Sequence, residues 1–327
     1  MDALKSWLAV ELKSHAFELT PASSDAGFRR YFRASFDGQT RIVMDAPPDK
    51  EDCRPFLAVG ELLREAGLHV PEVYASNLTQ GFLLLSDLGL KTYLQVLTEE
   101  NADELFQYAT DALLRWQLAS RPGVLPPYDE ALFKRELALF PDWYVGRHLG
   151  HTLTKPQQET LDNVFALILK NVLSQPAVFV HRDYMPRNLM VSTPNPGVLD
   201  FQDAVYGPIS YDVVSLFKDA FLSWPEERVL DWAIRYWEKA KRARLPVNQD
   251  FGEFYRDFEW MGLQRHLKVL GIFARLNYRD GKPSYLADTP RFITYVRDVA
   301  GRYGALKPLL RLLDDLESKR ATEGYTF

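Results

Sequence analysis

Short apolar runs in the first third of the chain predict strands arranged around one helix. Asp37-Gly38 stands between two runs rich in aromatic and β-branched residues, which predicts a β-hairpin. Apolar side chains at helical spacing from residue 51 to 66, closed by Gly67, predict the helix. The runs that predict strands are 28–36, 40–44, 70–74 and 81–85.

Helical spacing dominates the rest of the chain. The segments that predict helices are 101–119, 155–173, 226–243, 251–276 and 290–318. Short β-like runs interrupt them at 177–180, 189–191 and 197–199. Tyr206-Gly207-Pro208 predicts a turn, and a helix is expected from Val213 to Phe221.

These elements favour an α+β class and a bilobal architecture. A small β-rich N-lobe with one helix, residues 1–88, is expected to bind a nucleotide. A larger, mainly helical C-lobe, residues 89–327, is expected to hold the catalytic and substrate-binding groups. A hinge is expected at 86–90, and the length of 327 residues fits two domains.

Composition narrows the class of protein. Hydrophobic residues make up 46% of the chain, which excludes a disordered chain. The net charge of −5, from 39 Lys+Arg and 44 Asp+Glu, argues against binding nucleic acid. The single cysteine, Cys53, excludes an intrachain disulfide and a zinc site of paired cysteines, and it fits a reducing cytoplasm.

The sequence predicts neither a membrane span nor a signal peptide. No apolar run approaches the ~18 residues that a span needs. At the N-terminus, Leu4, Trp7, Leu8 and Leu12 fall at helical spacing, which predicts an amphipathic helix. We therefore expect a cytoplasmic protein that does not bind membranes.

One group of polar residues has the pattern of a catalytic site. His181-Arg182-Asp183 is followed by Asn188, and Asp200-Phe201 comes twelve residues later, which is the H-R-D-x-x-x-x-N and D-F pattern of kinase catalytic cores. Asp183 offers a carboxylate that accepts the proton of an attacking hydroxyl. Asn188 and Asp200 offer the oxygen ligands that Mg²⁺ prefers.

The stretch 181–219 resembles the aminoglycoside phosphotransferase family, whose second signature matches residues 199–213. The resemblance implies a protein-kinase-like fold, ATP as the phosphoryl donor and Mg²⁺. It also implies that Asp183 is catalytic, that Asn188 and Asp200 hold the metal, and that His181 and Asp212 support the catalytic loop. The residues alone leave open a plain helix N-cap for Asp212.

Within that family the chain is most similar to the anomeric amino-sugar kinases of bacterial cell-wall recycling. The likeness is carried by 28–33, 43–48, 83–89 and the catalytic loop. It implies that N-acetylmuramate and N-acetylglucosamine are phosphorylated on the anomeric hydroxyl in peptidoglycan recycling. The expected partners are a small amino sugar and a nucleotide, and a monomer is expected.

The nucleotide site departs from the kinase pattern, because Met44 stands where a third-strand lysine is usual. We expect arginines of the first hairpin to hold the phosphates in its place, unless they form a solvated strand face. Arg29 and Arg33 share one face of their strand and are preferred. The residues expected at the nucleotide are Gly27, Arg29, Arg33, Ser86, Asp87 and Leu88.

The acceptor is expected against the helix at 251–276. Glu259 can accept hydrogen bonds from sugar hydroxyls, Trp260 can stack on a sugar ring, and Arg265 can pair with a carboxylate. The alternative is an amphipathic helix whose polar face lies in water.

Two other functions stay open at this point. The first is a kinase of another small alcohol, with an aminoglycoside, choline or homoserine in place of the sugar. The missing lysine also allows a nucleotide-binding pseudokinase, although such a module has no need of all three of Asp183, Asn188 and Asp200.

Overall fold

The computed structural model describes residues 1–23 and 28–323. Contacts group the chain into two compact units. The first comprises Met1–Ala119 and Pro186–Ala204, and the second comprises Ser120–Met185 and Val205–Phe327. One division falls inside the predicted catalytic loop, between Met185 and Pro186, and the lobe boundary after residue 88 stays a prediction.

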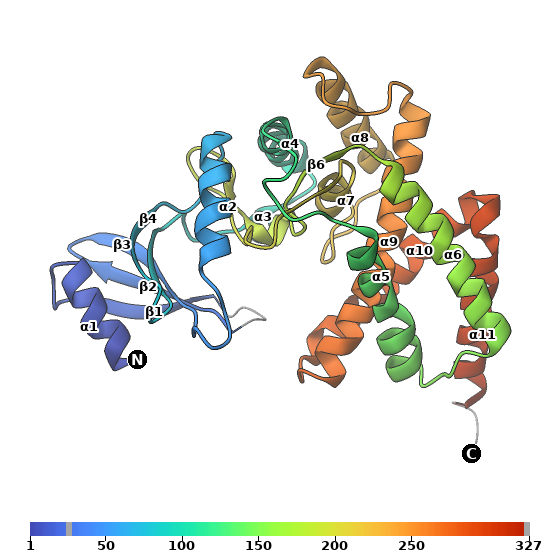
Figure 1. The fold of residues 1–327 in the computed structure, drawn as a ribbon, viewed down its shortest axis with the longest axis horizontal. Helices are drawn as coiled ribbons and strands as arrows, with labels where there is room; N and C mark the ends of the chain where they lie inside the picture. The colour runs from blue at the N-terminus through green and yellow to red at the C-terminus, as the bar shows by residue number, and fades with distance from the viewer. Residues whose placement is uncertain (24–27, 324–327) are drawn as a thin grey trace. The chain divides into compact units, whose positions relative to one another are not determined.

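The first unit contains a five-stranded antiparallel sheet in the order β1-β2-β3-β5-β4 (Figure 1). The predicted hairpin is confirmed, since Phe36 pairs with Gln39 across Asp37 and Gly38, both at positive φ. The edge strand β1 was not predicted. The strands are β1 (Glu18–Ser23), β2 (Arg30–Phe36), β3 (Gln39–Asp45), β4 (Val73–Asn77) and β5 (Phe82–Ser86).

The N-terminal helix α1 (Asp2–Glu11) packs on one face of this sheet, as its apolar spacing predicts (Figure 1). Leu4 and Leu8 form its buried side. They join a cluster of alternate strand residues, Ala34, Val43, Phe82 and Leu84. Because side chains alternate along a strand, one face of the sheet is thereby closed against water.

The first unit also contains helices and a two-stranded β pair. The helix α2 (Arg54–Glu65) lies inside the predicted range 51–66, and α4 (Ala102–Leu118) inside 101–119. The short pair β7 (Leu189–Met190) and β8 (Gly197–Val198) forms the expected β islands, and α3 (Tyr93–Val96) precedes α4.

The second unit is mainly helical, with the two-stranded pair β6 (Ala177–Val180) and β9 (Val205–Pro208). The helices predicted at 155–173, 226–243 and 251–276 are confirmed within two residues. Its helices are α5 (Glu130–Leu139), the π-helix η1 (Phe140–His148), α6 (Lys155–Ser174), α7 (Tyr211–Phe217), α8 (Glu226–Arg242), α9 (Phe251–Tyr278), η3 (Pro283–Asp288), α10 (Thr289–Arg302), η4 (Gly304–Leu306) and α11 (Lys307–Glu323).

Three predictions for this unit were wrong. The turn expected at 206–208 is part of β9, because Tyr206 and its neighbours pair with β6. The single helix expected at 290–318 is interrupted at Tyr303, whose backbone is extended. The helix expected from Val213 to Phe221 begins at Tyr211 and ends at Phe217, because the Asp219 carboxylate accepts the N–H groups of Phe221 and Leu222 outside the helix.

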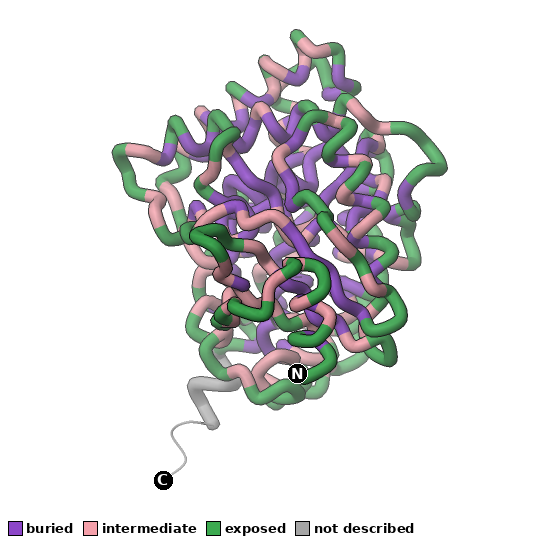
Figure 2. The backbone as a smooth tube through the Cα atoms, turned by 90° about the vertical axis from the view of Figure 1, so that its left-hand side faces the viewer, coloured by how far each residue is buried: buried purple, intermediate pink, exposed green. Residues whose placement is uncertain are grey.

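The helix α9 forms the core of the second unit. Every residue from 258 to 271 is buried, and continuous buried stretches of this kind are drawn purple in Figure 2. A helix that is buried all round has no polar face in water, so the amphipathic alternative does not hold for this part of α9. Its polar side chains therefore need partners inside the protein.

Within the described residues, no helix combines the length and the apolar character that crossing a bilayer requires.

The tightest approach to α9 is made at Gly271. A Cβ atom built there would lie 2.3 Å from the carbonyl carbon and oxygen of Leu139, at the end of α5. We expect Gly271→Ala to lower the free energy of unfolding by about 1–3 kcal/mol, because backbone cannot yield as a flexible side chain does. Urea denaturation followed by circular dichroism measures the effect.

Gly301 in α10 provides the matched control. Its built Cβ meets only Leu310 Cδ1, at 3.8 Å. Gly301→Ala should gain up to about 1 kcal/mol from helix propensity alone. Equal effects of the two substitutions would contradict the close packing at Gly271.

Candidate active site

The predicted catalytic loop leaves β6 and is held by the Asp212 carboxylate. Asp212 Oδ2 accepts a hydrogen bond from the N–H of His181 at 2.7 Å, and Oδ1 accepts one from the N–H of Arg182 at 3.0 Å. Since Arg182 lies at φ 76°, these bonds hold a backbone conformation that side-chain-bearing residues rarely adopt. This is the geometry of the loop support that the family resemblance implies.

Asp212 is not the N-cap of α7. The N-cap is Ser210, whose side chain makes no capping bond, and Asp212 lies in the first turn. Its complete burial raises the pKa of Asp212 to about 7, although the two N–H donors act in the opposite direction. The position of this carboxylate therefore serves the loop and not the end of the helix.

His181 supports the loop from within. The N–H of Asp183 faces His181 Nδ1 at 3.3 Å, and the imidazole packs edge-on against the buried Tyr184 at 5.6 Å. The N–H of Met185 in turn donates to the carbonyl of Asp183 at 3.0 Å. The backbone on both sides of Asp183 is thus fixed by local hydrogen bonds.

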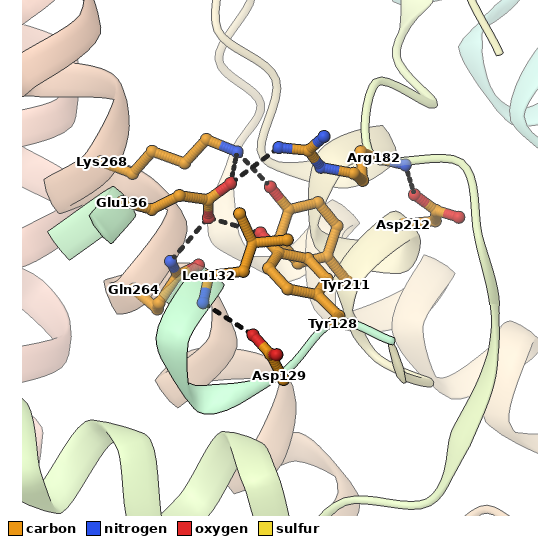
Figure 3. A network of polar contacts seen from close by, with 9 residues as sticks. All are labelled: Tyr128, Asp129, Leu132, Glu136, Arg182, Tyr211, Asp212, Gln264 and Lys268. Carbon is orange, nitrogen blue, oxygen red and sulfur yellow. Dashed lines mark hydrogen bonds and ion pairs between the residues drawn. The ribbon is translucent and has the colours of Figure 1, made fainter. Parts of the chain in front are cut away.

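The Arg182 side chain enters a buried polar cluster around Glu136 of α5 (Figure 3). Glu136 pairs with Arg182 at 2.8 Å and with Lys268 of α9 at 2.9 Å. It also accepts hydrogen bonds from the Tyr128 hydroxyl and from Gln264 Nε2. The cluster therefore ties the residue before Asp183 to α5 and α9.

The charges of this cluster stabilise one another. Burial works to raise the pKa of Glu136, but Lys268 and Arg182 overcome it and lower that pKa to about 2. The pKa of Lys268 is raised although burial opposes it, because Tyr211 and Glu136 surround its ammonium. Lys268 Nζ also lies 2.9 Å from the Tyr211 hydroxyl. Two cations thus share one carboxylate that stays ionised in the interior.

The sequence analysis missed this cluster. One signal was available, because Glu136 follows Phe133 by three residues and so falls on the apolar stripe of α5. A carboxylate on such a stripe needs a buried cation. The identity of that cation was beyond sequence reasoning, since Arg182 and Lys268 lie far along the chain.

The two predicted metal ligands lie together in the first unit. Asn188 ends a 3-10 turn, η2 (Pro186–Asn188), and its amide nitrogen lies 3.3 Å from Asp200 Oδ2. Gln202 Nε2 donates to Asp200 Oδ1 at 2.9 Å, and Asp200 lies at φ 62°. A carboxylate and an amide side by side fit Mg²⁺, which proteins hold through one or two such groups with substrate phosphates completing the shell.

No larger metal cluster accompanies them. In the part of the chain that the structure describes, no three His, Cys, Asp or Glu side chains gather in a way that could hold a metal ion.

Phe201, which follows Asp200, anchors this segment beneath α2. It is fully buried and stacks on Phe56 with ring centroids 4.8 Å apart. A Cβ at Gly60 would lie 3.3 Å from its ring, so the helix approaches closely. The packing of Phe201 therefore holds in place the backbone next to Asp200.

The arginines predicted to hold phosphates are paired with carboxylates. Arg29 contacts Glu51 through Nε at 3.2 Å and a terminal nitrogen at 3.1 Å. Arg33 makes a two-point contact with Asp87, at 2.6 and 3.1 Å, and donates to the Gly89 carbonyl. Two residues predicted at the nucleotide, Arg33 and Asp87, thus meet each other, and their contact with a nucleotide stays a prediction.

The remaining residues predicted at the nucleotide belong to the hinge segment and to the loop before β2. Ser86 Oγ accepts a hydrogen bond from the N–H of Glu72, which joins the end of β5 to the segment before β4. Leu88 is buried, and its side chain lies so close to Gly197 that a Cβ atom built there would be 2.9 Å from Leu88 Cδ1. Gly27 lies outside the described residues.

The three residues predicted at the acceptor are buried in α9. Glu259 is 1% exposed, and Arg302 and the Tyr303 hydroxyl bind its carboxylate. Trp260 packs edge-on against Tyr303. Arg265 is 2% exposed and donates from Nε to the Ser215 hydroxyl at 2.6 Å. These partners lie inside the second unit, and contact with an acceptor stays a prediction.

A family model described as the phosphotransferase enzyme family matches residues 18–247. The chain belongs to this phosphotransferase family. The family predicted from the catalytic loop and the 199–213 signature is thereby confirmed.

Close relatives of this phosphotransferase share one name. A Pseudomonas putida protein named N-acetylmuramate/N-acetylglucosamine kinase is 55% identical over 303 residues, which cover 93% of this chain and 89% of the relative. A Neisseria meningitidis protein of the same name is 50% identical over 330 residues, with 99% and 98% covered.

Solved structures show that the phosphotransferase has the predicted kinase-like α+β fold. Choline kinase LicA from Streptococcus pneumoniae superposes with a TM-score of 0.65 at 12% identity, covering 91% of this chain and 98% of that one. The ADP-bound aminoglycoside phosphotransferase APH(2'')-Ib gives 0.61 at 15% identity, with the same coverage. At these identities the likeness concerns the fold alone.

The Glu136 cluster predicts a large loss of stability when its carboxylate is neutralised. Glu136→Gln leaves Arg182 and Lys268 buried without their counter-ion, which should cost about 3–5 kcal/mol. Because the folded pKa of about 2 lies below the ordinary 4.5, the wild-type carboxylate stabilises above pH 4.5 and loses this contribution as the pH falls towards 2. The difference between wild type and variant in urea denaturation should therefore shrink over that range.

The matched control is Glu130→Gln on the same helix. Glu130 is 57% exposed and pairs with Lys134 on the surface of α5, so its loss should cost less than about 0.5 kcal/mol. A Glu136→Gln variant as stable as Glu130→Gln at pH 7 would show that the cluster does not stabilise the fold.

Proposed function

We propose that this phosphotransferase transfers the γ-phosphoryl group of ATP to the anomeric hydroxyl of N-acetylmuramate and N-acetylglucosamine. The observation that carries the proposal is 50–55% identity, over nearly the whole chain, to two proteins named for that pair of sugars. An anomeric hydroxyl is the OH group of a hemiacetal, and it is more acidic than the hydroxyl of an ordinary alcohol. A single carboxylate is therefore a sufficient proton acceptor for it.

Asp183 is the group that receives the proton of the attacking hydroxyl. The support for this role is the hydrogen bonding of its backbone, since His181 Nδ1, Asp212 and Met185 hold the loop on either side. A fixed backbone limits the positions that the carboxylate can reach, which lowers the entropic cost of aligning it with the hydroxyl.

Asn188 and Asp200 would hold Mg²⁺ with the ATP phosphates. A bound Mg²⁺ supplies neutralisation of phosphate charge. The protein's own contribution is orientation, because Gln202 fixes the Asp200 carboxylate and η2 fixes Asn188. The stacking of Phe201 on Phe56 keeps this segment in place.

The other acceptors considered from the sequence have less support. The choline and aminoglycoside kinases resemble this chain at 12–15% identity. The presence of Asp183, Asn188 and Asp200 on ordered segments also favours catalysis over a pseudokinase. A role in recycling cell-wall sugars in the cytoplasm would follow from this substrate choice.

The direct test is ATP consumption across a panel of acceptors. The panel contains N-acetylmuramate, N-acetylglucosamine, kanamycin, choline and homoserine. Phosphorus-31 NMR of the product then reports the position that was modified. Turnover with the two amino sugars and a sugar 1-phosphate signal is expected, and a product phosphorylated at another hydroxyl would overturn the anomeric assignment.

Asp183→Asn tests the proton acceptor, because it keeps the shape of the side chain and removes its basicity. We expect kcat to fall about 10²–10⁴-fold with little change in the Kd for ATP, since general base catalysis acts on the chemical step. Asp231→Asn, at a half-exposed ion pair on α8, is the control. A variant that loses ATP binding and turnover together would assign Asp183 to the nucleotide.

Asn188→Ala and Asp200→Ala test the metal ligands. Each should cut kcat/KM by orders of magnitude, because charge neutralisation by a metal is worth several kcal/mol. Each should also weaken the dependence of ATP affinity on Mg²⁺ in calorimetric titrations. Asn163→Ala, at an exposed position of α6, should change neither quantity. Unchanged Mg²⁺ dependence in both variants would place the metal elsewhere.

A further inference from the structure

A cavity of about 320 Å³ lies within the second unit, beyond the end of α7. Its walls come from the segment after α7, from the start of α8 and from α10. The residues that give it its chemistry are Lys218, Ser223, Trp224, Glu226, Arg291 and Tyr295. None of them belongs to the catalytic loop at 181–188 or to the acceptor residues predicted from the sequence. The volume lies at the lower end of the range for small-molecule sites.

Lys218 is the central feature of this cavity. It is 8% exposed, and its ammonium lies over two aromatic rings, 5.5 Å from the centroid of Tyr295 and 6.0 Å from that of Phe258. Within the described residues no carboxylate comes within ion-pair distance of it. Burial lowers the pKa of Lys218, although more distant carboxylates oppose the change. A buried ammonium without a counter-ion is costly, and an anion beside it would remove that cost.

The other charges around the cavity are already compensated or solvated. Arg302 binds both Glu226, at 2.5 Å, and Glu259. Arg291 donates to Asp288 at 2.8 Å and to the Ala220 carbonyl at 2.6 Å. Asp298 is exposed at the rim. Among the described residues that line the cavity, Lys218 is therefore the cation that remains for a ligand's anionic group.

The remaining wall suits a sugar. Trp224 and Tyr295 contribute aromatic side chains to the wall, beside the Arg228 guanidinium and the Lys218 ammonium that lie over their rings, and the apolar face of a sugar ring packs on aromatic side chains. The Ser223 hydroxyl and the Tyr295 hydroxyl lie 2.9 Å apart and offer donors and acceptors to ring substituents. The cavity thus combines one buried cation with surfaces that bind a neutral ring.

One short helix connects the cavity to the catalytic loop. Asp212, in the first turn of α7, holds the loop before Asp183, and Lys218 is the C-cap of the same helix. Six residues of helix rise about 9 Å. That length is comparable to a hexose carrying an ether-linked side chain.

We propose that Lys218 binds the carboxylate of the lactyl group of N-acetylmuramate and so selects the acidic sugar over neutral N-acetylglucosamine. The inference rests on the proposed function and adds to it the residue that reads the acceptor's charge. The two sugars differ in the lactyl ether alone. One cation at its carboxylate is therefore enough to discriminate between them.

Lys218→Met is the test, because methionine has a similar length and no charge. The ratio of kcat/KM for N-acetylmuramate to that for N-acetylglucosamine should fall about 10–100-fold, as expected for loss of a hydrogen bond to a charged group. Lys218→Arg should restore most of the ratio. Lys241→Met, which removes a lysine stacked at 4.1 Å on Trp237 outside the cavity, should leave the ratio unchanged.

A second measurement changes the ligand and leaves the protein intact. The wild type should use the methyl ester of N-acetylmuramate about 10–100-fold less well than the acid, and Lys218→Met should not distinguish the two. This arm remains informative if the variant fails to fold, because the wild type alone then reports whether the negative charge is recognised.

The outcomes separate the two proposals. Equal losses for both sugars in Lys218→Met, or a wild type that uses acid and ester alike, would overturn the inference and leave the proposed function standing. A wild type that phosphorylates neither sugar would overturn both.

Discussion

A single buried carboxylate, Glu136, sets the constraint on which the helical unit depends. It is surrounded by Arg182, Lys268, Tyr128 and Gln264, so the catalytic loop, α9 and the segment before α5 meet at one ionised group. A buried charge is tolerable only when its partners are in place, and each of these partners is itself too costly to bury alone. The cluster therefore behaves as a unit. Because Arg182 precedes Asp183, that unit includes the backbone of the catalytic loop.

The same principle explains why α9 carries so many polar residues at buried positions. Glu259 is matched by Arg302 and Tyr303, Arg265 by Ser215, and Lys268 by Glu136 and Tyr211. Together these pairs link α9 to the end of α10 and the residue after it, to α7 and to α5. Apolar packing alone would stabilise these contacts at several rotations of the helix. Pairs with fixed partners favour one rotation of the helix. The residues after β6 and around α7 thereby have a defined position.

Patterns within short stretches of the sequence predicted many of the helices and strands. Contacts between residues far apart in the chain could not be predicted in this way. The hairpin at Asp37-Gly38 and the helix α4 follow from turn chemistry and apolar spacing, which act over a few residues. The residues predicted to be catalytic were proposed on the same local grounds, since Asp183 and Asn188 stand on one loop. The prediction of a turn at β9 was wrong because the pairing of β9 with β6 joins residues far apart in the chain. The surroundings of Glu136 and Lys218 are side chains from distant parts of the chain, and the spacing of residues in the sequence does not reveal them.

In the proposed function, the short helix α7 joins loop support to recognition of the acceptor. Its first turn supplies Asp212, whose carboxylate fixes the loop that precedes Asp183. Its end supplies Lys218, buried against Phe258 and Tyr295. The helix itself is buried along its whole length and cannot shift without repacking its neighbours. The separation between Lys218 and Asp212, the residue that holds the loop, is therefore set by one rigid element. An acceptor that spans this distance would be aligned for transfer by the same contact that recognises its charge, so selectivity and positioning would have a common structural origin.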